Sequence, residues 1–394
     1  MVIHVVSFFN MTVLYILDYG TVGGATHSFL EMVVAMKKLG VQPIVCLGRK
    51  TDITTILKKE NIPYFCAGHR TVLESLSCDD MLFPIRYLKR YFYFWIKELI
   101  AFRKIGNINW AEIDVIHTNS ARNDIGCFIN KKYGIPHVMH IREFADSDFN
   151  CIAFRKNYIH VFNEYTTKFL SISEAVKRHW VGKGIVDEKV RVIYNGIHYE
   201  DISVSDDDVK RNSFRMIIAG GVYPTKGQHL AVQAIGYLPN NIRSNVSLDV
   251  VGWYDENYVR EMQDYAITRG YENQIKFIGS VNDVHERLGN YQIGLMCSRA
   301  EGFGRVTAEY MHAQLGVIAS DSGANPELIQ DGENGLLFKS GDAKSLADRI
   351  MKLYNDRDLL IRLSRAAKSK ANATYTQQKN AEAIYRVYQE ILNV

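Results

Sequence analysis

Short apolar runs rich in β-branched residues alternate with longer stretches whose apolar residues recur at helical spacing, almost throughout the chain. Such runs indicate buried strands, and the longer stretches indicate helices that cover them. The first series of expected strands is Thr12–Leu17, Gln42–Leu47, Val115–His117, His137–Met139, Phe169–Ile172 and Val190–Ile193. The second series is Met216–Ala219, Ser247–Val251, Ile275–Ile278, Ile293–Met296, Val317–Ala319 and Leu336–Phe338. This alternation predicts an α/β protein with two Rossmann-like, doubly wound parallel sheets.

The two series are separated by a segment with the composition of a linker. It contains the turn signal Asn195-Gly196 and an acidic run at 206–208. We therefore expect an N-terminal domain at 1–200 and a C-terminal domain at 201–376. The last segment, 377–394, is expected to be a helix because its apolar residues lie at helical spacing.

Composition narrows the class of protein. Hydrophobic residues make up 47% of the 394 residues and charged residues 23%, as in ordinary soluble globular proteins. The net charge of +4 is too mild and too dispersed to predict nucleic-acid binding. No apolar run approaches the roughly 20 residues of a membrane-spanning helix. The six cysteines form no C-x-x-C pair, which favours a reduced, cytoplasmic setting. The N-terminus lacks the features of a secretory signal, and Met11 offers a second start after an expected ten-residue extension.

The most informative stretch is Glu301-Gly-Phe-Gly-Arg-Val-Thr-Ala-Glu309, in which a Gly-x-Gly turn precedes an expected helix. The turn amides and the positive end of the helix dipole suit an anion. The carboxylates would repel a phosphate, so they suit hydroxyl groups or developing positive charge. On one straight helix eight residues would separate them by roughly 12 Å. Glycoside hydrolases place their two carboxyls about 5 to 9.5 Å apart. The spacing therefore favours carboxylates with different partners, and a nucleotide sugar as the ligand.

Three further features are candidate sites, each with a plainer alternative. The turn Gly23-Gly24-Ala25 follows the first strand and lets a backbone approach a phosphate, or it is a tight turn without a ligand. Lys226 precedes an expected helix and suits a diphosphate, or it is a solvated lysine. His140 lies at the C-terminal end of a strand, where open α/β sheets bind ligands, or it is a histidine satisfied by a backbone partner.

Three other segments are candidates for a function. Asp146-Ser147-Asp148 and Asp356-Arg357-Asp358 match the D-x-D pattern of metal-dependent sugar transferases, but we interpret both as solvated loops or helix starts. The segment 82–104 is rich in aromatic and basic residues. Such a segment lies on an anionic membrane surface or packs against the first sheet with its lysine amines in water.

Taken together, these motifs resemble the retaining glycosyltransferases of family 4, and the resemblance covers nearly the whole chain. Its strongest marker is the E-x7-E element Glu301…Glu309. The supporting matches, in chain order, are the glycine turn at 23–25, the strand with His140, the VIYNGI run at 192–197, Lys226-Gly227 and the run at 322–338. The resemblance implies the GT-B fold, in which two domains face each other across a cleft that holds a nucleotide-sugar donor.

The resemblance also implies roles for individual residues. Lys226 would bind the donor diphosphate, Glu309 the ribose hydroxyls and Glu301 the transferred sugar. His140 would lie beside that sugar, and the last helix would cross back to the first domain. The remaining implied donor contacts are Gly23, Gly24, Ala25, Gly279, Val281, Gly302, Phe303, Gly304, Arg305 and Val306.

The chain departs from the family pattern at one donor-site position. Gly221 stands where the family usually has an arginine five residues before the lysine, and Arg305 is a candidate to supply that charge. We expect a retaining, metal-independent enzyme without a cofactor that transfers a hexose-type sugar, with UDP as the expected carrier. The acceptor would be a glycan or a lipid-linked glycan, with the protein peripheral on the inner face of the membrane. The alternatives are a non-catalytic partner subunit of a transferase and an epimerase or phosphorylase on the same architecture.

Overall fold

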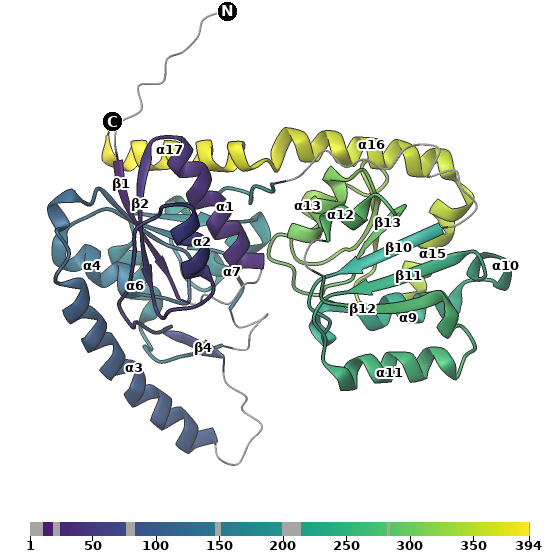
Figure 1. Ribbon diagram of the computed structural model, residues 1–394, viewed down its shortest axis with the longest axis horizontal. Helices are drawn as coiled ribbons and strands as arrows, with labels where there is room; N and C mark the ends of the chain where they lie inside the picture. Colours follow the sequence, from purple (N-terminus) through teal and green to yellow (C-terminus); the bar gives the residue numbers. More distant parts are fainter. Residues whose placement is uncertain are drawn as a thin grey trace, which may run out of the picture. The chain divides into compact units, whose positions relative to one another are not determined.

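The structure, a computed structural model, describes residues 11–18, 24–75, 83–145, 151–198, 214–281 and 284–393. The chain divides into two compact units (Figure 1). The first unit comprises residues 1–196 and 377–394, and the second comprises residues 197–376. The expected N-terminal extension, the triplet Asp146-Ser147-Asp148 and the acidic part of the expected linker lie outside the described residues.

The first unit is built on a seven-stranded sheet whose strands all pair in parallel. The order across the sheet is β3 (Tyr64–Cys66), β2 (Val41–Leu47), β1 (Met11–Leu17), β5 (Val115–Thr118), β6 (His137–Ile141), β8 (Lys168–Ser171) and β9 (Val190–Val192). A small antiparallel pair joins β4 (Leu73–Ser75) to β7 (Cys151–Ala153). Sequence reasoning missed β3, β4 and β7, because three residues are too few to show a period.

The second unit repeats this plan with six parallel strands. Their order is β12 (Ile275–Gly279), β11 (Val246–Val251), β10 (Phe214–Ala219), β13 (Ile293–Met296), β14 (Gly316–Ser320) and β15 (Leu336–Phe338). All twelve strands expected from the sequence are present, with ends shifted by at most two residues. The predicted fold class is therefore confirmed.

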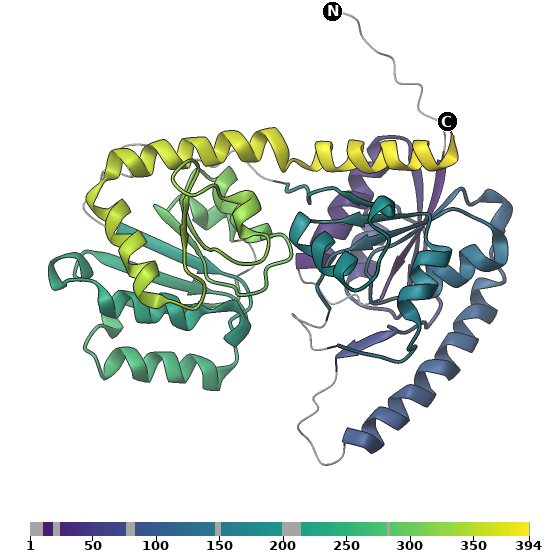
Figure 2. The ribbon, with the colours of Figure 1, turned by 180° about the vertical axis from the view of Figure 1, so that it is seen from behind.

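Helices cover the faces of both sheets (Figures 1 and 2). In the first unit they are α1 (Gly24–Lys38), α2 (Ile53–Lys59), α3 (Phe83–Ile105), α4 (Ile125–Tyr133), α6 (Tyr158–Tyr165), α7 (Glu174–Gly182) and α17 (Gln377–Leu392). In the second unit they are α9 (Gln228–Tyr237), α10 (Asn240–Arg243), α11 (Glu256–Ile267), α12 (His285–Leu288), α13 (Arg305–His312), α14 (Asn325–Leu328), α15 (Ala343–Asn355) and α16 (Arg357–Thr374). Asp356 caps α16 by accepting from the Leu359 amide, so the second D-x-D triplet is a helix start, as predicted.

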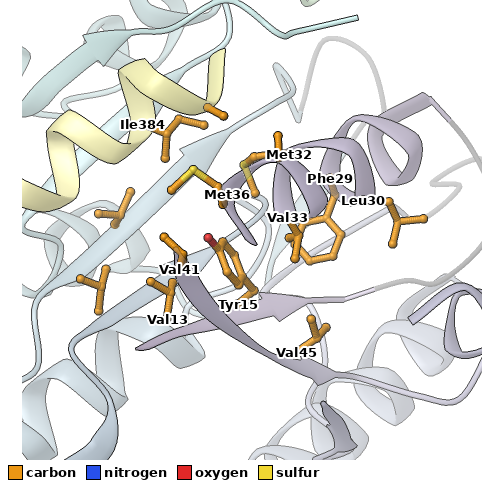
Figure 3. Packing of buried hydrophobic residues seen from close by; sticks show 14 of the residues in the cluster. Val13, Tyr15, Phe29, Leu30, Met32, Val33, Met36, Val41, Val45 and Ile384 are labelled. Atoms are coloured by element: carbon orange, nitrogen blue, oxygen red, sulfur yellow. The ribbon is translucent and has the colours of Figure 1, made fainter. Parts of the chain in front are cut away.

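The core of the first unit needs both ends of the chain. Val13 and Tyr15 of β1 pack with Met36 of α1 and with Ile384 of α17, all fully buried (Figure 3). Burying one such apolar side chain contributes about 1.5–3 kcal/mol. The helix α17 is therefore a structural part of the first unit.

In both sheets the strand order reverses direction at one place. Chain progression moves outward on one side from β1 and on the other from β5, and likewise from β10 and β13. At such a switch point the loops that leave the two central strands diverge to opposite faces of the sheet. A crevice forms at their carboxyl ends, where open α/β sheets bind ligands.

The helix α3 buries a carboxyl group. Glu98 is 3% exposed, and its Oε1 accepts from the Arg70 amide at 3.4 Å. Burial, followed by the nearby Asp124 carboxylate, raises the pKa of Glu98 to about 8, against the opposing effects of the Arg70 amide and the Arg155 charge. At neutral pH the folded protein therefore holds Glu98 largely protonated.

This protonation makes stability depend on pH. Between about pH 4.5 and pH 8 the unfolded chain loses the Glu98 proton while the folded chain keeps it, so the free energy of unfolding falls as pH rises, by at most about 1.4 kcal/mol per pH unit. We expect Glu98→Gln to flatten this fall, as measured by denaturant unfolding from pH 5 to pH 8. The exposed Glu188→Gln in the same unit is the control. A variant with the slope of the unchanged protein would show that Glu98 is ionised in the fold.

Candidate functional site

Lys226 follows the central strand of the second unit. Strand β10 ends at Ala219, and a short 3-10 turn, Pro224–Lys226, leads into α9. The turn ends at Gly227, which has φ +74°, and a Cβ there would lie 2.4 Å from the Cys297 carbonyl oxygen. Only glycine satisfies both conditions. The close approach of this backbone to the end of β13 fixes the place of Lys226.

Glu301 follows the other central strand, β13. Its carbonyl oxygen accepts from the Ala324 amide at 2.8 Å, which ties the loop to the segment before α14. Gly304, at φ +90°, then begins α13. Lys226 Nζ donates to Glu301 Oε2 at 2.9 Å. The loops after the two strands at the switch point therefore meet through a cation and a carboxylate.

Glu309 lies on α13 and is 8% exposed. Its Oε1 accepts from Arg305 Nε at 2.8 Å and lies 3.5 Å from His285 Nε2. Glu301 lies before the helix and pairs with Lys226, so each carboxylate has its own cationic partner. The Lys226–Glu301 pair and the Arg305–Glu309 pair are therefore each electrically balanced.

A buried tyrosine holds α13 in place. The Tyr310 hydroxyl accepts from the Ala219 amide at 2.8 Å, which joins the helix to the last residue of β10. Gly294 in β13 leaves room for the ring, because a Cβ there would lie 2.2 Å from Tyr310 Cδ2. Glu309 is therefore positioned by its neighbour in sequence, whose ring is fully buried.

The ring of Tyr223 lies beside Gly221. A Cβ at this position would lie 2.5 Å from Cε1 of Tyr223, so the tyrosine ring fills the space beside the glycine. The Gly221 carbonyl accepts from Gln228 Nε2 at 2.9 Å. A side chain at 221 would require Tyr223 to move. Arg305, the candidate substitute for the missing charge, is engaged with Glu309.

His140 belongs to the first unit, one strand away from the switch point. It lies within β6, which runs one residue beyond it, and its side chain is fully buried. Its Nδ1 lies 3.3 Å from His117 Nε2 and 3.3 Å from Arg142 Nη2. Burial, the Arg142 charge and then His117 lower the pKa of His140 well below its usual value, so the ring is neutral.

The predicted residues therefore fall into separate groups. Lys226, Arg305 and the two glutamates are brought together in the second unit, whereas His140 stands in the first. Phe303 is 2% exposed, and its ring packs against Tyr375 at 5.6 Å, so its side chain is core. The other predicted donor contacts are Gly302, Gly304 and Val306 around the start of α13, Gly279 and Val281 at the end of β12, and Gly24 and Ala25 at the start of α1. Gly23 lies outside the described residues.

Sequence reasoning missed several residues around these groups. His285 reaches Glu309 from α12, and no spacing linked the two. Asn195 meets Arg142, two residues after His140, only because of the fold. Tyr310, next to Glu309, carried no signal of its hydrogen bond to β10. Among the described residues no group of three or more His, Cys, Asp and Glu is placed to hold a metal ion.

Comparisons with known proteins identify the family of the chain. The model of glycosyltransferase family 4 matches residues 22–201, and the model of the glycosyl transferases group 1 matches residues 205–370. Between them they span most of the chain, which therefore belongs to the GT-B glycosyltransferases of the family 4 type. The protein is accordingly a glycosyltransferase.

Individual relatives have low sequence identity to this chain, but the matches cover most of its length. The capsular polysaccharide biosynthesis glycosyltransferase CapH of Staphylococcus aureus is 25% identical over 72% of this chain and 79% of its own. The UDP-Gal:α-D-GlcNAc-diphosphoundecaprenol α-1,3-galactosyltransferase of Escherichia coli is 22% identical over 74% of this chain and 79% of its own. The crystal structure of HepE from Anabaena, in complex with UDP, superposes with a TM-score of 0.77, with 21% identity, over 96% of this chain and all of that one.

The contact at Gly227 generates a stability prediction. We expect Gly227→Ala to lower the free energy of unfolding of the second unit by about 2–4 kcal/mol, because it adds both a left-handed φ and a clash with backbone. Gly341→Ala is the matched control, since Gly341 has φ +81° and open space at its Cβ. It should cost only about 1–2 kcal/mol in denaturant unfolding. Equal losses in the two variants would mean that the contact with Cys297 does not constrain the turn.

Proposed function

We propose that the protein is a retaining, metal-independent glycosyltransferase that moves a hexose from a nucleoside diphosphate sugar to a hydroxyl group of a glycan or lipid-linked glycan. The observation that carries the proposal is the pair of Lys226 and Glu301 at the carboxyl ends of the two central strands, 2.9 Å apart. A diphosphate calls for the lysine, and sugar hydroxyls call for the carboxylate. Only a ligand with both groups satisfies the two partners at once.

Breaking the Lys226–Glu301 ion pair to bind a ligand costs little free energy. The two side chains are 30% and 15% exposed, and an ion pair of this kind contributes at most about 1 kcal/mol. A diphosphate carries more negative charge than the single carboxylate and also meets the amides at the start of α13. On donor binding Lys226 would turn to the diphosphate, and Glu301 would be released to accept from hydroxyl groups of the sugar. Glu309, on the helix behind, would accept from the ribose.

The chemistry rests on stabilising a leaving group. As the bond from the sugar to the diphosphate lengthens, negative charge grows on the phosphate and positive charge on the sugar carbon. Lys226 and the helix-start amides would stabilise the first, and Glu301 the second, by fixed charges already in place. A phosphate oxygen would take the proton of the attacking hydroxyl on the same face of the sugar. Configuration would then be retained without a covalent intermediate.

The names of related proteins, and the ligand bound in one of them, support the finer assignments. HepE, with the same fold, was solved with UDP bound, which supports UDP as the carrier. CapH is named for capsular polysaccharide biosynthesis, and the E. coli relative for a lipid-linked diphosphate acceptor. We therefore propose UDP-hexose as the donor and a growing glycan, lipid-linked in at least its first steps, as the acceptor.

The donor proposal predicts a thermal shift that depends on Lys226. UDP at a hundredfold excess over its Kd should stabilise the protein by about 2.7 kcal/mol, and GDP or ADP should do less. Lys226→Ala should abolish the UDP shift and reduce kcat for UDP-hexose transfer by about 10²- to 10³-fold. Lys276→Ala, an exposed lysine in the same unit, is the control. Normal turnover in Lys226→Ala would refute the role of the lysine.

The same assay separates the remaining alternatives. An epimerase would convert the donor sugar without an acceptor, and a phosphorylase would require inorganic phosphate. A non-catalytic subunit would show neither transfer nor donor hydrolysis alone. Activity that persists with a chelator and without added metal supports the metal-independent mechanism, whereas loss of activity restored by a divalent ion would contradict it.

The helix α3 favours a site on an anionic membrane surface. Of the nine large apolar side chains exposed in the described part of the first unit, eight lie on α3. Five of them form one stripe at helical spacing, Ile85, Leu88, Phe92, Ile96 and Leu99, each at least 53% exposed. The helix also carries six basic residues against one acidic residue, the buried Glu98. Exposed apolar stripes flanked by bases are typical of helices that lie in the headgroup region of anionic lipids.

The helix α3 packs against the rest of the first unit through the face opposite the stripe, and only through that face. Phe94, Glu98, Ala101 and Ile105 are buried, at spacings of three and four residues. No helix among the described residues is long and apolar enough to cross a membrane. We therefore propose that α3 lies on the surface of the lipid that carries the acceptor.

Vesicle flotation tests this assignment. The protein should float with vesicles that contain phosphatidylglycerol and much less with phosphatidylcholine alone. The triple change of Leu88, Phe92 and Ile96 to Ser should weaken partitioning at least about tenfold, because each buried apolar side chain contributes more than 1 kcal/mol. The same change at Tyr237, Trp253 and Ile267, which are exposed on the second unit, is the control. A concentration-dependent dimer lost in the α3 variant, with no flotation, would instead assign the stripe to a second copy of the chain.

A further inference from the structure

An open groove lies between two helices of the second unit, α9 and α11. Both helices cover one face of the six-stranded sheet, and α13, which carries Glu309, covers the other (Figure 1). The groove has a volume of about 380 Å³. Binding sites for small molecules have volumes of about 300 to 1,000 Å³. The groove is therefore large enough for a ligand, and it lies wholly within one unit.

The walls of the groove are one face of each helix. The helix α11 contributes every wall residue at helical spacing, from Tyr258 to Tyr265. The helix α9 contributes His229 and the residues three and four positions later, Val232 and Gln233. Helix faces with this spacing usually pack side chain against side chain. Here the two faces leave an open space between them.

The floor of the groove is apolar and its rim is polar. Val232 and Met262 are buried, whereas Gln233 is half-buried and Glu261 is exposed. The Gln233 amide, the Glu261 carboxylate and the Tyr265 hydroxyl have no hydrogen-bond partner among the described residues. The rim thus presents two kinds of acceptor and an amide donor to a ligand.

Two tyrosine rings form part of the walls. The Tyr258 hydroxyl lies 2.7 Å from His229 Nδ1 and accepts from the His229 amide at 3.2 Å. These contacts join the starts of the two helices and hold the Tyr258 ring in place. One face of the Tyr265 ring is covered by the Arg269 guanidinium, 3.7 Å from the ring centroid.

The charges around the groove exclude two classes of ligand. No lysine or arginine is among the described residues that line it. Burial, followed by the Arg299 charge, lowers the pKa of His229, so this ring is neutral at pH 7. A phosphate or another anion would therefore meet no cation in the lining and would be repelled by Glu261. An organic cation would be repelled by Arg269, which already occupies the Tyr265 ring.

An uncharged ligand with several hydroxyl groups fits the remaining features. A wholly apolar ligand would cover the Gln233 amide and the Glu261 carboxylate without replacing their water. Hydroxyl groups donate to a carboxylate and accept from an amide. The C–H faces of a sugar ring can pack on the tyrosine rings and the apolar floor. We propose that the groove between α9 and α11 binds a short, uncharged segment of a glycan chain.

This inference rests on the proposed function for the identity of the glycan, and it adds a binding point outside the donor site. None of the predicted donor contacts lines the groove. The groove does include Pro224, which begins the turn that ends at Lys226. A glycan chain held there stays with the enzyme after a transfer, at a raised effective concentration for the next one.

Methyl NMR of methionine-labelled protein tests the groove without donor or transfer. The Met262 signal is assigned by its loss in Met262→Leu, a change that conserves volume. The probes are the neutral sugars maltotriose, cellotriose and mannotriose. We expect at least one of them to shift the Met262 methyl signal saturably, and the shift to persist in the presence of UDP. The anionic sugar trigalacturonate and the cation choline should leave the signal in place.

Variants at the rim test the proposed contacts. Gln233→Ala combined with Glu261→Ala should weaken sugar binding about tenfold, because two hydrogen-bonding groups are lost. Gln263→Ala combined with Glu272→Ala is the matched control, since both positions are exposed in the same unit and do not line the groove. Thermal unfolding checks that each variant is folded. Unchanged affinity in the rim variant would overturn the proposal. So would a Met262 shift caused by trigalacturonate or choline and by none of the neutral sugars.

The outcomes separate this proposal from the proposed function. If a neutral sugar binds beside Met262 but the protein transfers no sugar from UDP-hexose, the groove remains a glycan site and only the proposed function fails. If transfer is found but all three neutral sugars leave the Met262 signal in place, the groove is not a glycan site and the proposed function stands.

Discussion

The arrangement of the second unit follows from one constraint, the reversal of strand order between β10 and β13. Because crossovers between parallel strands are right-handed, the helices that leave these two strands must cover opposite faces of the sheet. The loops that start them diverge at the carboxyl edge. Lys226 stands on one loop and Glu301 on the other, so a cation and a carboxylate far apart in sequence meet without any long-range motif. The same reversal places Gly24 and Asn119 after the two central strands of the first unit.

In the absence of a ligand, the charges of this edge neutralise one another. Lys226 pairs with Glu301, and Arg305 pairs with Glu309. Under the proposed function, a diphosphate that bound Lys226 would leave Glu301 with an unpaired negative charge close by. Hydroxyl groups of the sugar, or positive charge developing at the sugar carbon, would then be its partners. The resting ion pair would in that way link the binding of the two ends of a nucleotide sugar.

The sequence predicted the helices and strands but not the side-chain contacts between them. Every expected strand exists because apolar β-branched runs such as Val246–Val251 can only be satisfied in a sheet covered on both faces. The spacing of Ile384, Val387 and Tyr388 predicted α17, but it could not show that Tyr388 reaches His117, 271 residues earlier in the chain. The glycine turn before α13 was visible in the sequence, whereas the contact between Gly221 and Tyr223 depends on the conformation of one tyrosine ring. Period and turn chemistry are local, while the partner of a polar side chain is set by the whole fold.

The exposed face of α3 raises the question of how a helix with so much uncovered apolar surface stays attached. Phe94 packs against Phe154, with ring centroids 5.5 Å apart, on the side away from the stripe. Arg155 lies over the Trp95 ring at 4.7 Å and pairs with the buried Asp124 at 2.6 Å, which connects α3 to the start of α4. A cation held by a buried carboxylate loses little further hydration when it stacks on an aromatic ring. The helix α3 is therefore attached through one narrow face, by packed rings and a cation held by a carboxylate. Its opposite face, with the apolar stripe, stays exposed.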